Sequence, residues 1–227
     1  MDLKLIHRSP AAARECGDFI LGLLDGKPRS TLAISGGSSP RPMFEYFAAC
    51  GFDWSRVDLF WVDERAVPPD DPRSNFKLAN DLWLQPAKFP EANIHRIHGE
   101  LEPHAAARMY VEEIRTVFRL VPGDLPEFDV IHLGMGADGH TASLVADEPM
   151  INDRRGIAAA LWVEKFHMWR ITLLPGVLLA ARQIAMLEAG ADKAETLRAV
   201  LEGPYDPLKL PAQLALTARA TEWFVVA

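Results

Sequence analysis

The strongest constraint on this chain is the alternation of short apolar runs with amphipathic segments of helical period. Runs such as 57–62 (VDLFWV) and 129–133 (DVIHL) are typical of strands buried on both faces. In 11–24 and 104–121, apolar residues recur at helical spacing. Strands alternating with helices predict an α/β fold with a mostly parallel sheet covered by helices on both faces. No linker divides the 227 residues, so we expect 1–227 to form a single domain.

The other elements follow from the same two patterns, with 157–163 and 168–173 taken to continue the alternation. The expected strands are 31–35, 57–62, 94–97, 129–133, 157–163, 168–173, 183–188 and 222–226. The expected helices are 11–24, a segment opening at Pro40 or Pro42, 75–84, 104–121, 175–182, 192–202 and 211–219.

Charge and composition exclude several classes of protein. The net charge is −7, from 24 basic and 31 acidic residues, which argues against nucleic-acid binding. An anionic ligand would therefore need a local concentration of basic groups. We find no signal peptide and no apolar run of the roughly 18 residues that a membrane span needs, so we expect a cytoplasmic protein. The two cysteines form no CxxC motif, which argues against a thiolate zinc site.

Three of the expected strands end in unusual polar turns. These are Ser35–Pro40 (SGGSSP), Asp63–Arg65 (DER) and Gly134–Thr141 (GMGADGHT). In an open parallel sheet, ligands bind outside the carboxyl ends of the strands. We therefore expect the three turns to meet at one edge of the sheet, although they lie far apart in the sequence.

The first turn has the composition of an anion site. Gly36 and Gly37 allow the backbone to approach a ligand closely, and Ser38 and Ser39 add hydroxyl groups. The helix that follows presents free N–H groups and a partial positive charge, which favour a phosphate. The alternative is a plain strand-to-helix turn with a serine cap.

The second turn places charged residues directly after a buried strand, where they are costly unless paired or used. Arg65 is suited to clamp an anionic group, and Asp63 lies beside it. Ser74 and Asn75 either close the same pocket or cap the helix that follows. The alternative for this turn is a surface salt bridge.

The third turn offers acid–base chemistry. His140 can accept a proton from water near neutral pH, and Asp138 can fix its tautomer. The same turn contains a literal GxGxxG, so a dinucleotide site with Glu164 on the ribose is an alternative. That alternative is weaker, because a pyrophosphate prefers bare backbone to a carboxylate and a histidine.

Two basic residues later in the chain are able to complete an anion site. Arg170 lies in an expected strand, and Lys193 lies at a helix start, where it opposes the helix dipole. The alternative for Lys193 is an ordinary exposed lysine. Among the other histidines, His132 is expected in the core, and His95 and His98 lack the companions of a metal site.

With these residues in place, the sequence resembles the 6-phosphogluconolactonases. The matching blocks are SGGSSP at 35–40, WVDERAVPPDDPRSN at 61–75 and LGMGADGHTASL at 133–144, and they are specific in order and spacing. The resemblance implies a Rossmann-like α/β fold, no metal or organic cofactor, and hydrolysis of 6-phospho-D-glucono-1,5-lactone to 6-phosphogluconate in the oxidative pentose phosphate pathway. Water would be activated by a histidine general base.

The residues above and the resemblance together give the expected site residues and partners. The assigned residues are His140 and Asp138 for catalysis, and Gly36, Gly37, Ser38, Ser39, Asp63, Arg65, Ser74, Asn75, Gly136, Arg170 and Lys193 for substrate binding. The expected partner is a small-molecule sugar-phosphate lactone, with no nucleic acid and no membrane, and the expected state is a monomer or a small homo-oligomer.

The related glucosamine-6-phosphate deaminases share the first and third turns and remain the second interpretation. In that family the histidine turn typically continues as Ile-Ala-Phe-Asn-Glu-Pro, whereas here it continues as Thr-Ala-Ser-Leu from Thr141 to Leu144. A non-catalytic sugar-phosphate binder is a further alternative.

Overall fold

The computed structural model describes residues 5–226 and places seven strands in one sheet. Every pair of neighbouring strands in this sheet runs parallel. In spatial order the strands are β1 (Leu5–Arg8), β10 (Thr221–Val225), β9 (Ile184–Glu188), β6 (Val130–Leu133), β2 (Ser30–Ile34), β3 (Val57–Trp61) and β5 (Ile94–His95). The predicted α/β class with a mostly parallel sheet is confirmed.

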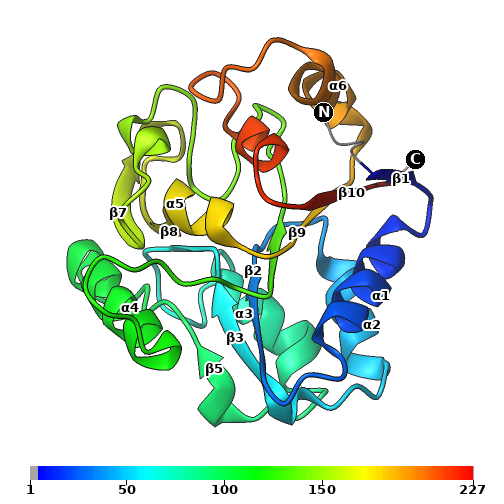
Figure 1. Cartoon of the computed structure of the whole chain (residues 1–227), viewed down its shortest axis with the longest axis vertical. Coiled ribbons are helices and arrows are strands. Elements are labelled where there is room, and N and C mark those ends of the chain that lie inside the picture. Colours follow the sequence, from blue (N-terminus) through cyan, green and yellow to red (C-terminus); the bar gives the residue numbers. More distant parts are fainter. Residues whose placement is uncertain (1–4, 227) are drawn as a thin grey trace.

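Helices cover both faces of the large sheet, as expected because the residues of its central strands β2, β3, β6 and β9 are almost all buried. Figure 1 shows α1 and α2 side by side on one side of the sheet and α4 on the other. The α-helices are α1 (Ala12–Leu24), α2 (Arg41–Ala49), α3 (Asn75–Ala79), α4 (Pro103–Phe118), α5 (Pro175–Ala180) and α6 (Ala194–Glu202). Short 3₁₀ or π turns lie at η1 (Trp54–Arg56), η2 (Asn80–Leu84), η3 (Glu91–Asn93), η4 (Pro149–Asn152), η5 (Glu164–Phe166), η6 (Ala191–Lys193) and η7 (Pro211–Leu216).

A second, antiparallel sheet corrects the sequence prediction. It contains β4 (Asp63–Arg65), β8 (Met168–Leu173) and β7 (Ala158–Val163) in that order. The prediction that 157–163 and 168–173 continue the parallel alternation is therefore wrong. Only four residues connect them, and a parallel pair needs a crossover of a dozen or more. Asp63–Arg65 was expected as a turn and is instead a strand of this sheet.

The remaining differences from the prediction are one missed strand and two segments with another helix type. The sequence analysis missed β1, which pairs with β10 at the sheet edge. The helix expected at 75–84 changes from α to π geometry at Asn80, and the one expected at 211–219 is a 3₁₀ turn. Among residues 5–226, no helix is long and apolar enough to cross a membrane.

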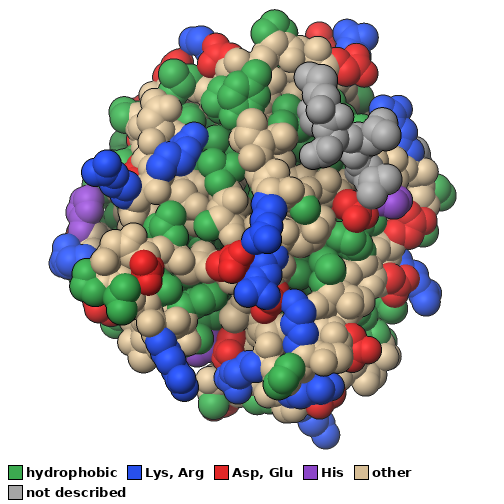
Figure 2. Space-filling model, in the orientation of Figure 1, with side chains coloured by type: hydrophobic (Ala, Val, Ile, Leu, Met, Phe, Trp, Pro, Cys, Tyr) green, Lys and Arg blue, Asp and Glu red, His purple; other side chains and the backbone are tan. Residues whose placement is uncertain are grey.

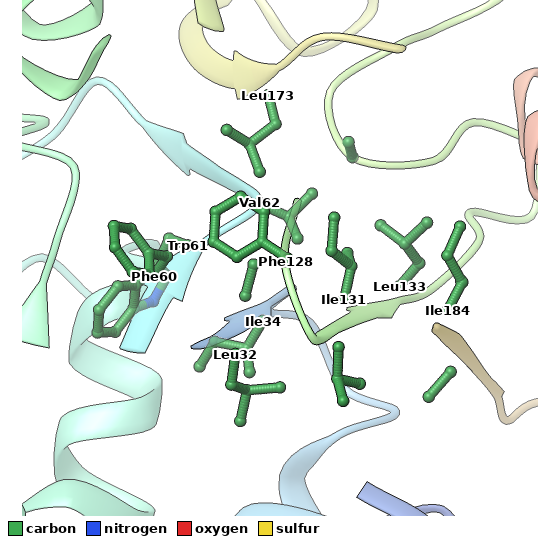
Figure 3. Packing of buried hydrophobic residues seen from close by; sticks show 14 of the residues in the cluster. Leu32, Ile34, Phe60, Trp61, Val62, Phe128, Ile131, Leu133, Leu173 and Ile184 are labelled. Atoms are coloured by element: carbon green, nitrogen blue, oxygen red, sulfur yellow. The ribbon is translucent and has the colours of Figure 1, made fainter. Parts of the chain in front are cut away.

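The two sheets share one hydrophobic core, and this junction positions the site. Figure 3 shows Leu173 of β8 directed at the cluster that contains Val62 and Phe128. The backbone N–H of Leu173 also donates to the carbonyl oxygen of Val62 at 2.8 Å. The small sheet is therefore fastened to the carboxyl end of β3, where the sequence analysis expects the ligand.

Candidate active site

A cavity of about 190 Å³ lies at the carboxyl ends of β2, β6 and β9. All three polar turns reach it, so the expected convergence is confirmed. The predicted site residues that line it are Gly36, Gly37, Ser38, Ser39, Asp63, Arg65, Asn75, Gly136, His140, Arg170 and Lys193. Ser74 and Asp138 are the two predicted residues outside this lining: Ser74 directly precedes Asn75 in the chain, and Asp138 is hydrogen-bonded to His140.

The turn after β2 is built to leave backbone N–H groups free. Gly37 has a φ of +102°, which a side chain disfavours. A Cβ on Gly36 would lie 1.9 Å from Oδ1 of Asn75, so only glycine fits against that amide. Within residues 5–226, the amides of Gly37, Ser38 and Ser39 donate no hydrogen bond. They remain available to an anion at the start of α2.

The buried carboxylate of Glu64 organises the segment after β4. It accepts hydrogen bonds from the hydroxyl of Ser74 at 2.9 Å and from the amides of Arg65, Asn75 and Phe76 at 2.7, 2.8 and 2.7 Å. Burial raises the pKa of Glu64, while these four donors act in the opposite direction. Ser74 in turn caps α3 by accepting from the amide of Lys77 at 3.1 Å. The structure thus gives Ser74 the capping role that the sequence analysis left open.

Asp63 connects the small sheet to the cavity wall. Its carboxylate accepts from Oγ of Ser143 at 2.6 Å and from Nδ2 of Asn75 at 3.3 Å. One nitrogen of Arg170 lies 3.6 Å from Oδ2 of Asp63. Within the described chain, Oδ1 of Asn75 is buried without a partner, which leaves an acceptor at the cavity.

Two arginines face the cavity as cross-strand partners. Arg65 on β4 pairs with Arg170 on β8, and the buried Nε atoms of both have no partner among residues 5–226. Burial lowers the pKa of Arg170, and the ring of Phe166 lies 4.5 Å from its guanidinium carbon. Arg65 also donates to the carbonyl of Arg73. Two adjacent guanidinium groups with unused N–H donors favour an anionic ligand.

Lys193 adds a third cation to the lining of the cavity. It precedes α6, and its ammonium lies 3.4 Å from Oγ of Ser39 and 3.2 Å from Oε2 of Glu188. The sequence analysis did not single out Glu188. The signal was present, because Glu188 is a charged residue that ends a buried strand, much as Asp63 directly follows the buried run 57–62. The three cations supply the local basic concentration that an acidic chain needs for an anion. By contrast, Figure 2 shows Lys and Arg side chains interspersed with Asp and Glu on the face that it draws.

The turn after β6 carries His140, whose ring nitrogen Nδ1 is hydrogen-bonded to a carboxylate. Nδ1 lies 2.5 Å from Oδ1 of Asp138, and the ammonium of Lys165 donates to the other oxygen of Asp138 at 2.6 Å. The hydrogen bond with His140, aided by Lys165, holds the pKa of Asp138 well below its usual range. Among residues 5–226, Nε2 has no hydrogen-bond partner, and His140 lines the cavity. Lys165 was missed, because nothing in the sequence brings the β7–β8 turn to this site.

In this turn, Gly136 makes room for the ring of His140, which bears on the dinucleotide interpretation. A Cβ on Gly136 would lie 2.1 Å from Cε1 of His140, so the ring packs directly against the glycine backbone that a pyrophosphate would have to approach. Glu164, the expected ribose ligand, is exposed and accepts from the indole of Trp162 at 2.6 Å. These contacts argue against the dinucleotide interpretation. The expected core position of His132 is confirmed, since it is fully buried in β6.

The arrangement combines a proton acceptor with an anion site. An imidazole held by a carboxylate can take a proton from a bound water, which is general-base chemistry. Three cations and a set of free amides in the same small cavity can hold a phosphate and stabilise a developing oxyanion. A phosphorylated substrate with a carbonyl centre fits this combination.

Comparisons with known proteins agree with the geometry. The family model described as glucosamine-6-phosphate isomerases/6-phosphogluconolactonase matches residues 8–224. A 6-phosphogluconolactonase from Synechocystis is 36% identical over 188 residues, which cover 82% of this chain and 77% of that protein.

Solved structures extend the likeness. A crystal structure of 6-phosphogluconolactonase from Thermotoga maritima has a TM-score of 0.85 and 27% identity, covering 99% of this chain and all of that one (100%). A monomeric glucosamine-6-phosphate deaminase has a TM-score of 0.82 at 17% identity, covering 98% of this chain and 97% of that chain, a likeness of fold alone. On the family model and the identity to curated relatives, this chain belongs to the glucosamine-6-phosphate isomerase/6-phosphogluconolactonase family.

Proposed function

We propose that the protein hydrolyses 6-phospho-D-glucono-1,5-lactone to 6-phosphogluconate. The observation that carries this proposal is the presence of the His140–Asp138 pair and three cations at one cavity. The names of the curated relatives, which are 6-phosphogluconolactonases at 33–36% identity, support the same reaction. The reaction needs a base, an anion site and an oxyanion site.

In the proposed mechanism, Nε2 of His140 takes a proton from water as the water attacks C1 of the lactone. Asp138 holds Nδ1 and stabilises the imidazolium that forms. The C1 oxygen becomes an oxyanion, for which free backbone amides are suitable donors. The tetrahedral intermediate then collapses, the bond from C1 to the ring oxygen breaks, and the imidazolium returns its proton to that oxygen.

Arg65, Arg170 and Lys193 hold the anionic parts of the substrate in this proposal. The Ser38 and Ser39 hydroxyls lie on the same wall as Lys193 and add donors for a phosphate. Because these groups bind the substrate at a distance from the reacting carbon, their loss acts chiefly on KM. Loss of the base acts on kcat.

The test compares lactone loss in the presence of the protein with the spontaneous rate. We expect the wild-type protein to accelerate hydrolysis and His140→Asn to lower kcat by about 10²–10⁴-fold, the usual contribution of a general base. His167→Asn is a matched control, because that side chain is 79% exposed and outside the cavity. Arg65→Ala should chiefly raise KM. Wild-type turnover by His140→Asn at saturating lactone would show that the assigned base is wrong.

A deaminase acting on glucosamine 6-phosphate remains the second candidate, because the family model includes both activities. Ammonia release from glucosamine 6-phosphate, without acceleration of lactone loss, would favour it. Thermal stabilisation by NAD(P) would favour the dinucleotide alternative. Binding of 6-phosphogluconate without turnover would indicate a non-catalytic binder.

The wider setting of the reaction belongs to the same proposal. We place the protein in the oxidative pentose phosphate pathway, as a single catalytic domain that requires no cofactor. The cytoplasmic location, the monomeric or small homo-oligomeric state, and the lack of nucleic-acid or membrane partners stay predictions from the sequence.

A further inference from the structure

A buried acid stands behind one cation of the anion site. Oε2 of Glu188, the last residue of β9, lies 3.2 Å from the ammonium of Lys193. Glu188 is 2% exposed, and within residues 5–226 its other oxygen has no hydrogen-bond partner. A carboxylate buried with so little hydrogen bonding is costly. It also opposes an anion bound nearby, so the proposed mechanism gives no reason for its presence.

We propose that Glu188 is a positioning residue of the anion site: its carboxyl group holds the Lys193 ammonium at the Ser39 turn, and its charge sets how strongly Lys193 attracts the phosphate. The inference rests on the proposed function of this wall of the cavity as a phosphate site.

The contacts explain the positioning. A free lysine side chain loses rotamer entropy when it binds an anion. Here Glu188 and Ser39 each lie within 3.4 Å of the ammonium, from β9 and from the turn after β2. An ammonium has three N–H donors, so one stays available for a phosphate oxygen when these two are engaged. The lysine is therefore held in place before the substrate arrives.

The charge of Glu188 links anion binding to a proton. Burial raises the pKa of Glu188 to about 7, although Lys193 and, to a smaller extent, the backbone N–H of Met135 act in the opposite direction. An anion beside Lys193 competes with the carboxylate for the same ammonium, so anion binding favours the protonated form of Glu188. By reciprocity, protonation of Glu188 tightens anion binding. The affinity for an anion should therefore fall as the pH rises through about 7.

Other charged groups lie near Glu188, but the link between its protonation and anion binding runs through Lys193. A second cavity of about 410 Å³ is lined by Glu188 and Lys193 together with Arg8 of β1 and Arg198 and Glu202 of α6. His140 and Arg170 line the active-site cavity, which Lys193 also lines. Within the described chain, Lys193 is the charged group in hydrogen-bond contact with the carboxylate.

The test measures binding of sulfate, which keeps its charge between pH 6 and pH 8.5, by calorimetry. We expect wild-type affinity to fall about tenfold over this range, within the usual size of a coupling between two sites. Glu188→Gln retains a hydrogen-bond acceptor without the charge, so it should bind sulfate as the wild type does at pH 6, with a flatter pH profile. Glu202→Gln changes the same charge in the neighbouring cavity and should follow the wild type.

A third variant isolates the positioning. Glu188→Leu removes the acceptor as well and should bind sulfate more weakly than Glu188→Gln at every pH. Equal pH profiles for the wild type and Glu188→Gln, or an absence of sulfate binding, would overturn the charge linkage. Equal affinities for the Leu and Gln variants would overturn the positioning. Because sulfate binding requires no turnover, these outcomes are separate from a failure to hydrolyse the lactone.

Discussion

His140 and His95 are both hydrogen-bonded to carboxylates, but they differ in whether a ring nitrogen stays free of such a bond. The ring of His140 binds Asp138 through Nδ1 and lines the cavity, with 20% of its side chain exposed. The ring of His95 binds Glu113 through Nδ1 at 2.6 Å and Asp58 through Nε2 at 3.1 Å, with 9% exposed. A histidine with both ring nitrogens hydrogen-bonded stabilises the folded structure. One with a nitrogen left at a cavity can move a proton.

The charges around the two rings sharpen this comparison. Burial lowers the pKa of His95, but its hydrogen bonds to Asp58 and Glu113 outweigh burial and leave the pKa above its ordinary value. Burial likewise raises the pKa of Asp58, and His95 and Arg29 bring it below the ordinary value. This network lies at the start of β3, whereas the active-site cavity lies at the carboxyl ends of the strands.

The largest expected contrast is in turnover. Asp138→Asn removes the charge that stabilises the imidazolium and can reverse the tautomer of His140, so kcat should fall by about 10²-fold or more, up to the 10⁴-fold that a base contributes. Asp58→Asn makes the same chemical change beside His95 and should leave kcat near the wild-type value. The measurement is the initial rate at saturating lactone. Comparable losses in both variants would erase the distinction between the two histidines.

For stability we expect the opposite order: Asp58→Asn should have the larger effect and Asp138→Asn the smaller one. Asp58→Asn weakens the hydrogen bonds with Arg29 and His95 in a buried setting, and should lower the free energy of unfolding by about 1–3 kcal/mol. Asp138→Asn should have a smaller effect, because its partner Lys165 is 56% exposed. Urea titrations of the two variants provide the comparison. A less stable Asp138→Asn protein would contradict it.

Two serines allow a similar comparison with smaller effects. Ser74 caps α3, so Ser74→Ala should lower the free energy of unfolding by about 0.5–2 kcal/mol. Ser39 lies at the cavity beside Lys193, so Ser39→Ala should act on KM more than on stability. Thermal unfolding and steady-state kinetics on both proteins check this assignment. A KM effect confined to Ser74→Ala would exchange their roles.

The smallest expected effect is a pH dependence of stability. Because the folded-state pKa of His95 is raised, its contribution is complete below the unfolded value of about 6.5 and is lost as the pH rises through the folded value. The stability difference between the wild type and His95→Gln should therefore be larger at pH 5.5 than at pH 9. Glu188 is present in both proteins and cancels. A difference that grows with pH would reverse the sign assigned to His95.

The convergence of the three turns was predictable because it depends on a general property of parallel sheets. The runs at 31–35, 57–62 and 129–133 were recognisable, and their carboxyl ends must share one edge. The small sheet was missed for a reason that the sequence contains. Four residues between 157–163 and 168–173 are too few for a parallel crossover.

Contacts between distant segments explain the remaining gaps. Glu64 was noticed as a charge after a strand, but its four donors come mostly from residues ten to twelve positions further on. The contact of Lys165 with Asp138 depends on how the β7–β8 turn lies against the large sheet. Periodicity within each segment carries no information about such contacts, whereas a rule on buried charge at strand ends would have found Glu188.

The tip of the β7–β8 hairpin contacts both the proposed base and one of the anion-binding arginines. Phe166 lies edge-on to His140, with ring centroids 5.8 Å apart, and also lies beneath the guanidinium of Arg170. One aromatic side chain thus touches both the group that moves a proton and a group that holds charge. Any substitution at Phe166 therefore changes the surroundings of the base and of an anion-binding arginine together.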